Sequence, residues 1–282
     1  MSFSAIFIRL ADDDPATIVW LRMSMAAVLL LPFAARRGRE VVHRGGPARW
    51  AITLASGALL AAHFLLWTAS LQYTSVAASV LLVSVHPLVV IPLGRRLLGD
   101  SIPSRAVVGA VLAIAGTVIT CAADVRVDQR ALIGDLMALG GALSLAGYLL
   151  IGRRVRAQTG VAAYSMSVYA VVAVAAATVA VAEGRPHFAS PRVALLCLAL
   201  AVVCTLGGHT VYNWALRHVR AATISIAFLG EPPLAAVLAL LILGAVPSAA
   251  TITGGVLILI GLGVTLFERQ AQPGSAGATA LP

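Results

Sequence analysis

Nine long apolar stretches follow one another along the chain, separated by short polar segments. They cover residues 16–35, 50–70, 74–94, 104–122, 132–152, 161–182, 193–215, 219–243 and 249–267, and a shorter one covers residues 2–11. A helix of roughly 20 apolar residues crosses the hydrocarbon layer of a bilayer. The stretches lack the polar–apolar alternation of barrel strands, so helices are the expected spanning elements. The pattern therefore predicts an all-α, polytopic membrane protein.

The second half of the chain repeats the pattern of the first half at a constant offset of 145 residues. Leu71, Pro87, Leu98, Gly99, Gly109 and Gly116 recur as Leu216, Pro232, Leu243, Gly244, Gly254 and Gly261. Between residues 67–117 and 212–262, 10 of 51 positions are identical without a gap. The shared prolines and glycines are the residues that fix backbone geometry. We expect the four glycines at 109, 116, 254 and 261 to permit close helix packing.

Each copy is expected to contribute five spans, and an odd number places the second copy upside down relative to the first. Inverted repeats of this kind are typical of secondary transporters, whose site lies between the halves. We therefore predict two inverted five-helix repeats, residues 1–122 and 132–267, followed by a disordered cytoplasmic tail, residues 268–282. Arg9 falls opposite Arg154 at this offset, so residues 2–11 match only the latter half of helix 132–152. This predicts a truncated first helix; the alternative is a short interfacial helix in a nine-span protein.

Composition supports the membrane assignment. Hydrophobic residues make up 60% of the chain and charged residues 11%, with a mean hydropathy of +0.96. A soluble domain carries about 25% charged residues. The three cysteines lie in or at the ends of spans and have no metal-ligand spacing, so small packing residues are the favoured interpretation.

The net charge of +9 comes from basic residues that are concentrated on one predicted side of the membrane. All 20 basic residues are arginine, and alternating helices place 14 of them on one side: Arg36, Arg37, Arg39, Arg44, Arg49, Arg95, Arg96, Arg105, Arg153, Arg154, Arg156, Arg217, Arg220 and Arg269. The loops of the other side hold Arg126, Arg130, Arg185 and Arg192 with the acidic run at 12–14. The arginine-rich side is expected to be cytoplasmic, which predicts a multi-pass protein of the inner (plasma) membrane with a cytoplasmic C-terminus. A nucleic-acid partner would need a basic, aromatic-rich soluble face and is not expected.

The paired halves resemble a known family. The stretch YNWALRHVRAATISIAFLGEPPLAAVLALLILGAVPSAATITGGVLILIGLGV at 212–264 resembles the final helices of EamA-type transporters of the drug/metabolite transporter superfamily. Residues 67–118 resemble the matching part of the first repeat, and SFSAIFIRLA and PATIVWLRMSMAAVLLLP resemble its opening helices. The resemblance covers residues 2–267. It implies ten helices in two inverted repeats, cytoplasmic termini, and export or uptake of small metabolites without ATP. The acidic residue that often follows Leu-Gly in this family is present as Asp100 but replaced by Ala245 in the second copy.

Glu231 is the sharpest candidate for function. It lies near the middle of the span 219–243 and is followed by Pro232 and Pro233. A charged group costs about 2.5–3.5 kcal/mol at the centre of a membrane helix on insertion scales, and proline breaks the backbone ladder. Such a carboxylate could bind an amine or carry a proton; the alternative is a structural glutamate paired with an arginine or a hydroxyl group. His86, before Pro87, holds the equivalent position in the first copy, and two broken helices at matching positions indicate a transporter's site. The histidine could also simply donate a hydrogen bond to a carbonyl group.

Other polar residues inside the spans are weaker candidates. Arg22 could bind a substrate carboxylate, act as counter-ion to Glu231, or extend toward the outer membrane edge; its position favours the last. His209 and Asn213 lie four residues apart on one helix face, and His63 lies within one residue of the repeat partner of His209. Lining of a cavity and hydrogen bonding in the core both account for them. Trp67 and Tyr148 could wall that cavity, although packing is the commoner role of such aromatics.

The sequence favours a transporter over other classes of membrane protein. GxGD, HExxH and Gly-rich phosphate-binding motifs are absent, so we expect neither an enzyme nor a cofactor. The predicted function is proton-coupled secondary transport, in the direction of export, of amino acids or related amphipathic compounds. The expected partners are a small-molecule substrate and the lipid bilayer, and the chain could form a homodimer. A non-transporting scaffold or sensor is the main alternative, and a membrane-embedded enzyme is less favoured.

Overall fold

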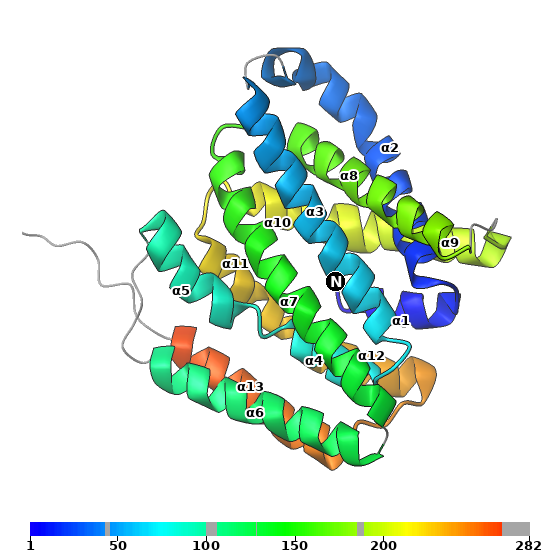
Figure 1. The fold of residues 1–282 in the computed structure, drawn as a ribbon, viewed down its shortest axis with the longest axis vertical. Coiled ribbons are helices and arrows are strands. Elements are labelled where there is room, and N and C mark those ends of the chain that lie inside the picture. Colours follow the sequence, from blue (N-terminus) through cyan, green and yellow to red (C-terminus); the bar gives the residue numbers. More distant parts are fainter. Residues whose placement is uncertain (43–45, 100–105, 128, 185–188, 267–282) are drawn as a thin grey trace, which may run out of the picture.

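The computed structural model describes residues 1–42, 46–99, 106–127, 129–184 and 189–266, and its regular structure is helical over these ranges (Figure 1). In chain order the helices are α1 (Phe3–Ala11), α2 (Pro15–Val42), α3 (Gly46–Ser70), α4 (Val76–Val83), α5 (Pro87–Leu98), α6 (Ala106–Val127), α7 (Gln129–Arg156), α8 (Val161–Ala182), α9 (Pro191–Ala199), η1 (Leu200–His209), α10 (Thr210–Ala215), α11 (Ala221–Ala227), η2 (Phe228–Gly230), α12 (Glu231–Leu243) and α13 (Ala249–Leu266). η1 is a π-helix and η2 is a single 3₁₀ turn. The all-α class is thus confirmed for this part of the chain. The predicted tail at 268–282 and Asp100 lie outside it.

Six helical segments of the described chain are long and apolar enough to cross a membrane: Pro15–Ala35, Trp50–Ser70, Val76–Leu98, Gln129–Arg156, Val161–Ala182 and Pro191–Ala215. Three further apolar helices are shorter: Val111–Thr120, Glu231–Leu243 and Ala249–Gly261. Each of the nine predicted stretches overlaps one of these segments, the stretch 219–243 only over its second half. The prediction of nine full-length spans is met by six in the described residues. One cause is that the stretch 219–243 is divided between α11, η2 and α12.

Two of the apolar stretches are interrupted at prolines. α4 ends at Val83 and α5 begins at Pro87, with a turn between them. In the second half, η2 separates α11 from α12, and Pro232 and Pro233 follow the first residue of α12. Proline has no N–H, and its ring clashes with the carbonyl group of the preceding turn, so it disfavours a continuous α-helix at these two places. Pro32 and Pro92, by contrast, are accommodated inside α2 and α5. Each interruption thus divides one apolar stretch into two half-helices.

Helices from the two halves of the chain pack extensively on each other (Figure 1). α6 lies along α13 at one edge of the molecule, α2 packs on α8, and α3 packs on α7. Among the interrupted segments, α4 contacts α12 and α5 contacts α11. α1 contacts α9 and η1. The halves are therefore interleaved, and residues from both can meet at the centre.

Glycines allow α6 and α13 to approach closely. A Cβ atom at Gly116 would overlap the carbonyl oxygen of Gly254, and a Cβ atom at Gly261 would overlap the carbonyl oxygen of Gly109. Lipid tails are as apolar as leucine, so helices in a bilayer associate through close packing of small residues. The structure agrees with the close packing expected from these four glycines.

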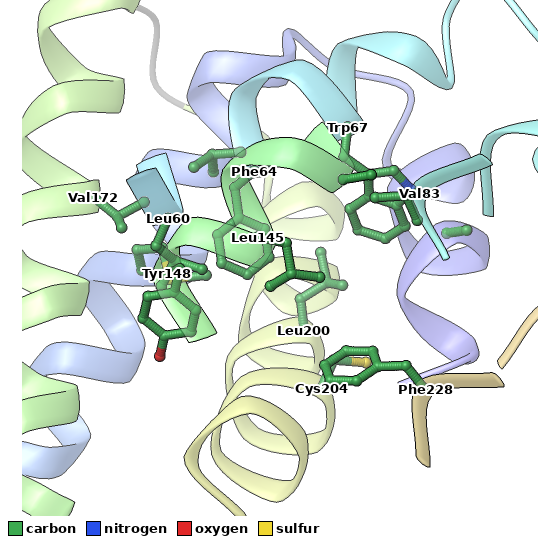
Figure 2. Packing of buried hydrophobic residues seen from close by; sticks show 14 of the residues in the cluster. Leu60, Phe64, Trp67, Val83, Leu145, Tyr148, Val172, Leu200, Cys204 and Phe228 are labelled. Atoms are coloured by element: carbon green, nitrogen blue, oxygen red, sulfur yellow. The ribbon is translucent and has the colours of Figure 1, made fainter. Parts of the chain in front are cut away.

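The exterior of the molecule is apolar, and its centre contains aromatic side chains. Val246, Leu241 and Val174 are 79%, 74% and 68% exposed. An exposed apolar surface of this kind suits contact with lipid. The buried cluster includes Phe64 and Phe228, which come from the first and second halves of the chain (Figure 2).

Candidate functional site

A small cavity, here called the central cavity, lies between helices of the two halves. Its volume is about 20 Å³, and roughly 10–15 Å³ on this measure admits one water molecule. The lining residues come from α1, α3, α4, α7, η1, η2, α12 and the turn before α5. They are Met1, Ser4, His63, Trp67, Val83, Ser84, His86, Leu145, His209, Phe228 and Glu231. Figure 2 shows Trp67, Val83, Leu145 and Phe228 among these residues.

Four of the predicted site residues line the central cavity, namely Glu231, His86, His209 and His63. Two do not: Arg22 and Asn213. Pro87, Pro232 and Pro233 lie directly after two of the lining residues, His86 and Glu231, where they begin the second half-helix of each interrupted segment.

Glu231 lies at the break between η2 and α12. It is the first residue of α12, where a carboxylate interacts favourably with the helix dipole. Its Oε1 atom is buried and has no hydrogen-bond partner among the described residues. A buried carboxylate oxygen without a partner is costly, so this atom is available to a proton or to a donor that enters the cavity.

His86 occupies the equivalent break in the first half, and its side chain is 1% exposed. The Nδ1 atom lies 3.1 Å from the carbonyl oxygen of Val83, four residues before Pro87. Since Pro87 has no N–H, this carbonyl group lacks its usual helical donor, and the histidine replaces it. The Nε2 atom is buried without a partner in the described chain, and the ring meets Phe228 edge-on at 5.1 Å between centroids.

His63 and His209 lie close together in the cavity wall. Their ring centroids are 6.2 Å apart. His63 stacks on Trp67 at 6.1 Å, and its Nδ1 atom lies 3.0 Å from the carbonyl oxygen of Gly141 on α7. His209 ends the π-helix η1 and packs edge-on against Phe64 at 4.9 Å. The two halves therefore each supply an imidazole at the same place in the wall.

Arg22 does not extend toward the outer membrane edge, which was the favoured prediction. The residue is 1% exposed. Its Nε atom donates to Thr205 Oγ1 at 2.7 Å, and Nη1 donates to Ser4 Oγ at 3.1 Å. The guanidinium group also lies 4.5 Å from the centroid of the Phe64 ring. These contacts outweigh extension to water because they combine two charge-assisted hydrogen bonds with a cation–π contact. Arg22 thus lies behind Ser4, outside the cavity wall.

Asn213 belongs to a different polar network. It accepts a hydrogen bond from the Tyr148 hydroxyl group and donates through Nδ2 to Ser165 Oγ at 3.0 Å. The backbone carbonyl oxygen of Asn213 accepts a hydrogen bond from Nε of the buried Arg156 at 2.7 Å. Asn213 lies four residues after His209 and so shares a helix face with it. The rise over four residues is about 6 Å, and this shift along the helix axis places Asn213 outside the cavity wall. Tyr148 belongs to this network, whereas Trp67 lines the cavity.

Sequence reasoning missed several residues of this centre. Phe228, Ser84 and Leu145 look like ordinary core residues in the sequence, and only the helix breaks and packing bring them to the cavity. The π-helix was also missed. In η1 the Thr205 hydroxyl group donates to the carbonyl oxygen five residues earlier, at 3.1 Å, while it accepts from Arg22. π-Helical segments occur often at functional sites, but no composition signal marked this one.

The chemistry available in the cavity is acid–base and hydrogen-bonding chemistry. No group of three or more His, Cys, Asp or Glu residues within the described ranges has the arrangement of a metal site. The cavity instead offers one carboxylate, imidazole nitrogens and aromatic faces. Such a set can hold and release a proton or a small polar group.

These features define a multi-pass membrane protein with polar groups enclosed at its centre. The chain matches the EamA-like transporter family over residues 1–122 and 132–267. It therefore belongs to the EamA-like transporter family, which is part of the drug/metabolite transporter superfamily. The resemblance expected from the sequence is thus confirmed, and the chain is a member of a family of membrane transporters.

Individual relatives are distant in sequence but match most of the chain. An uncharacterized transporter of Clostridium kluyveri is 25% identical over 257 residues, covering 88% of this chain and 82% of that protein. An uncharacterized transporter of Archaeoglobus fulgidus is 22% identical over 280 residues, covering 95% and 93%. A protein crystal structure superposes with a TM-score of 0.69 at 18% identity and covers 94% of this chain and 95% of its own. That structural likeness establishes the fold alone.

Proposed function

We propose that the chain forms ten transmembrane helices in two inverted repeats of five. The contacts between the halves support this arrangement because they come in exchanged pairs. The 145-residue offset maps the contact between α4 and α12 onto the contact between α11 and α5. It also maps the Gly116–Gly254 contact onto the Gly261–Gly109 contact. Reciprocal contacts of this kind are those that a two-fold axis generates, and five spans per repeat would lay that axis in the membrane plane.

We further propose that the protein is a secondary transporter that alternately opens the central cavity to the two sides of the membrane. The observation that carries this proposal is Glu231, whose buried oxygen faces a cavity at a helix break. His86 lies at the repeat-equivalent break and lines the same cavity. Transporter sites are typically formed by discontinuous helices at the interface between repeats. A cavity of about 20 Å³ is too small for a metabolite, so it must widen to admit one and open to each side in turn.

Proton coupling is proposed to run through Glu231. A single carboxylate can bind either a proton or the substrate, but not both at once. Because each must leave before the other binds, the proton and the substrate cross the membrane in opposite directions. The inward proton gradient would then drive export of a small metabolite such as an amino acid or a related amphipathic compound. The arginine distribution supports a plasma-membrane location with the arginine-rich loops and the C-terminus in the cytoplasm.

Untargeted metabolite profiling of cells and medium tests this proposal. Cells that express the chain are expected to accumulate at least one metabolite in the medium relative to cells with an empty vector. A protonophore should remove most of that difference, because it collapses the gradient that drives exchange. The protein must be shown in the membrane fraction in each culture.

Two outcomes would contradict the proposal. Unchanged profiles with the protein in the membrane would favour a scaffold or sensor that moves nothing. Release that persists unchanged with the protonophore would keep the transporter but remove proton coupling.

A further inference from the structure

The hydrogen bonds of His86 and His63 determine what these rings offer to the central cavity. Each Nδ1 atom contacts a carbonyl oxygen, that of Val83 at 3.1 Å and that of Gly141 at 3.0 Å. A carbonyl oxygen can only accept, so Nδ1 carries the hydrogen in both bonds. In a neutral imidazole the other nitrogen, Nε2, is then an acceptor. Together with Glu231 Oε1, these two rings offer three acceptor atoms, beside the hydroxyl groups of Ser4 and Ser84 and the ring of His209 in the same wall. Two of the three are buried without a partner in the described residues: Glu231 Oε1 and His86 Nε2.

The backbone at the two helix breaks adds few donors to balance these acceptors. The start of a helix usually presents free N–H groups that attract anions. In α12, Pro232 and Pro233 have no N–H. In α5, Pro87 has none, and the next two N–H groups, of Leu88 and Val89, donate to the carbonyl oxygens of Val85 and His86 at 2.9 and 3.0 Å. Few free N–H groups are therefore left at these two helix starts to bind an anion.

Aromatic side chains complete the wall. Trp67 and Phe228 line the cavity, and Phe228 packs against His86 and His209. Aromatic faces attract cations, particularly where water is excluded. The Trp67 Nε1 atom is the buried donor without a partner among the described residues of the wall. Two cationic groups lie nearby: the Arg22 guanidinium, which directs two donors to Thr205 and Ser4 and does not line the cavity, and the α-amino group of Met1, a residue of the wall.

On this basis we propose that the central cavity binds the primary ammonium group of the transported compound. An ammonium group has three N–H donors, which match the oxygen of Glu231 and the Nε2 atoms of His86 and His63. It is close to a water molecule in size, so the cavity of about 20 Å³ can hold this group, while the rest of the substrate requires the cavity to widen. This inference rests on the proposed transport function, and it names the chemical group that the site recognises.

Binding of matched small molecules to the purified full-length protein tests the inference. The probes are 2-phenylethylamine and n-butylamine, the trimethylammonium analogue of each, and the carboxylates 3-phenylpropanoate and pentanoate. Binding is measured by titration calorimetry. We expect at least one primary amine to bind, and its trimethylammonium analogue to bind roughly tenfold more weakly or worse, because it keeps the charge but has no N–H donor. The carboxylates should not bind. Glu231→Gln should remove amine binding, whereas Glu183→Gln, at the exposed end of α8, should retain it.

Each other outcome overturns the inference. A carboxylate that binds as tightly as its amine would show an anion site. Equal binding of the amine and its trimethylammonium analogue would show recognition of charge without the hydrogen bonds. If no probe binds while cells release a metabolite without an amino group in a Glu231-dependent way, the transport proposal stands and the ammonium inference fails.

Discussion

Replacing Glu231 with glutamine is expected to abolish transport while leaving the protein folded. The substitution keeps the shape of the side chain but removes its charge and its ability to carry a proton. Losing one member of a buried charge interaction typically costs 2–5 kcal/mol, so flux should fall by roughly 30-fold or more. Stability should be unchanged or slightly higher, because a neutral side chain is less costly than a charged one at membrane depth. Flux of the exported metabolite and thermal unfolding of the purified protein measure the two effects.

Glu183 provides the matched control for this substitution. It is exposed at the C-terminal end of α8 and does not line the central cavity. Glu183→Gln should therefore transport as well as the unmodified protein. Full flux by the Glu231→Gln variant would exclude Glu231 from substrate binding and from proton coupling. A large drop in its melting temperature would instead assign the residue a structural role.

Replacing Gly261 with alanine is expected to destabilise the packing of α13 on α6. In a helix, alanine is intrinsically favoured over glycine by about 1 kcal/mol, so a loss of stability would have to come from the contact. The new Cβ would overlap the carbonyl oxygen of Gly109 and would lie 2.7 Å from the backbone nitrogen of Ala113. These are backbone atoms that cannot rotate away. Overpacking of this kind costs typically 1–3 kcal/mol, which should appear as a lower free energy of unfolding.

Gly255→Ala, in the same helix, is the control that separates the effect of the α6–α13 contact from the general effect of alanine in a helix. A Cβ atom there would lie 3.4 Å and 3.6 Å from the two methyl groups of Leu81, which is ordinary van der Waals contact. Gly255→Ala should thus be neutral or stabilising. Gly116→Ala, at the repeat-equivalent position of Gly261, should be destabilised as Gly261→Ala is. If Gly261→Ala and Gly255→Ala have the same stability, the close approach of α6 and α13 does not hold.

The sequence was most informative about local features. The apolar stretches gave the helices because the length and polarity of a membrane helix are set by the bilayer itself. Pro87 and Pro232 indicated where helices would be interrupted, because proline acts on the backbone of its own turn. Glu231 and His86 could be singled out because an ionisable residue inside an apolar stretch is costly.

Features that depend on several distant helices could not be predicted in the same way. Arg22 lies two turns into its span, and nothing local indicates that Thr205 and Ser4 are within its reach. Asn213 and His209 share a helix face, yet only the surrounding side chains decide which of them meets the cavity. Phe228 lies in the 3₁₀ turn η2 between α11 and α12, and its side chain lines the cavity. A wall made by side chains of seven helical elements and the turn before α5 is a property of packing rather than of any single motif.

Accessibility of the central cavity from the two sides of the membrane tests the central claim most directly. Ser84 lines the cavity, and Ser84→Cys can be introduced after Cys121, Cys197 and Cys204 have been replaced. A membrane-impermeant maleimide is then applied to vesicles of each orientation. Val246→Cys and His218→Cys, in exposed segments proposed to face opposite sides, serve as one-sided controls. Alternating access predicts labelling of Ser84→Cys from both sides, with exported substrate slowing both reactions. Labelling from only one side, in a variant that still transports, would contradict it.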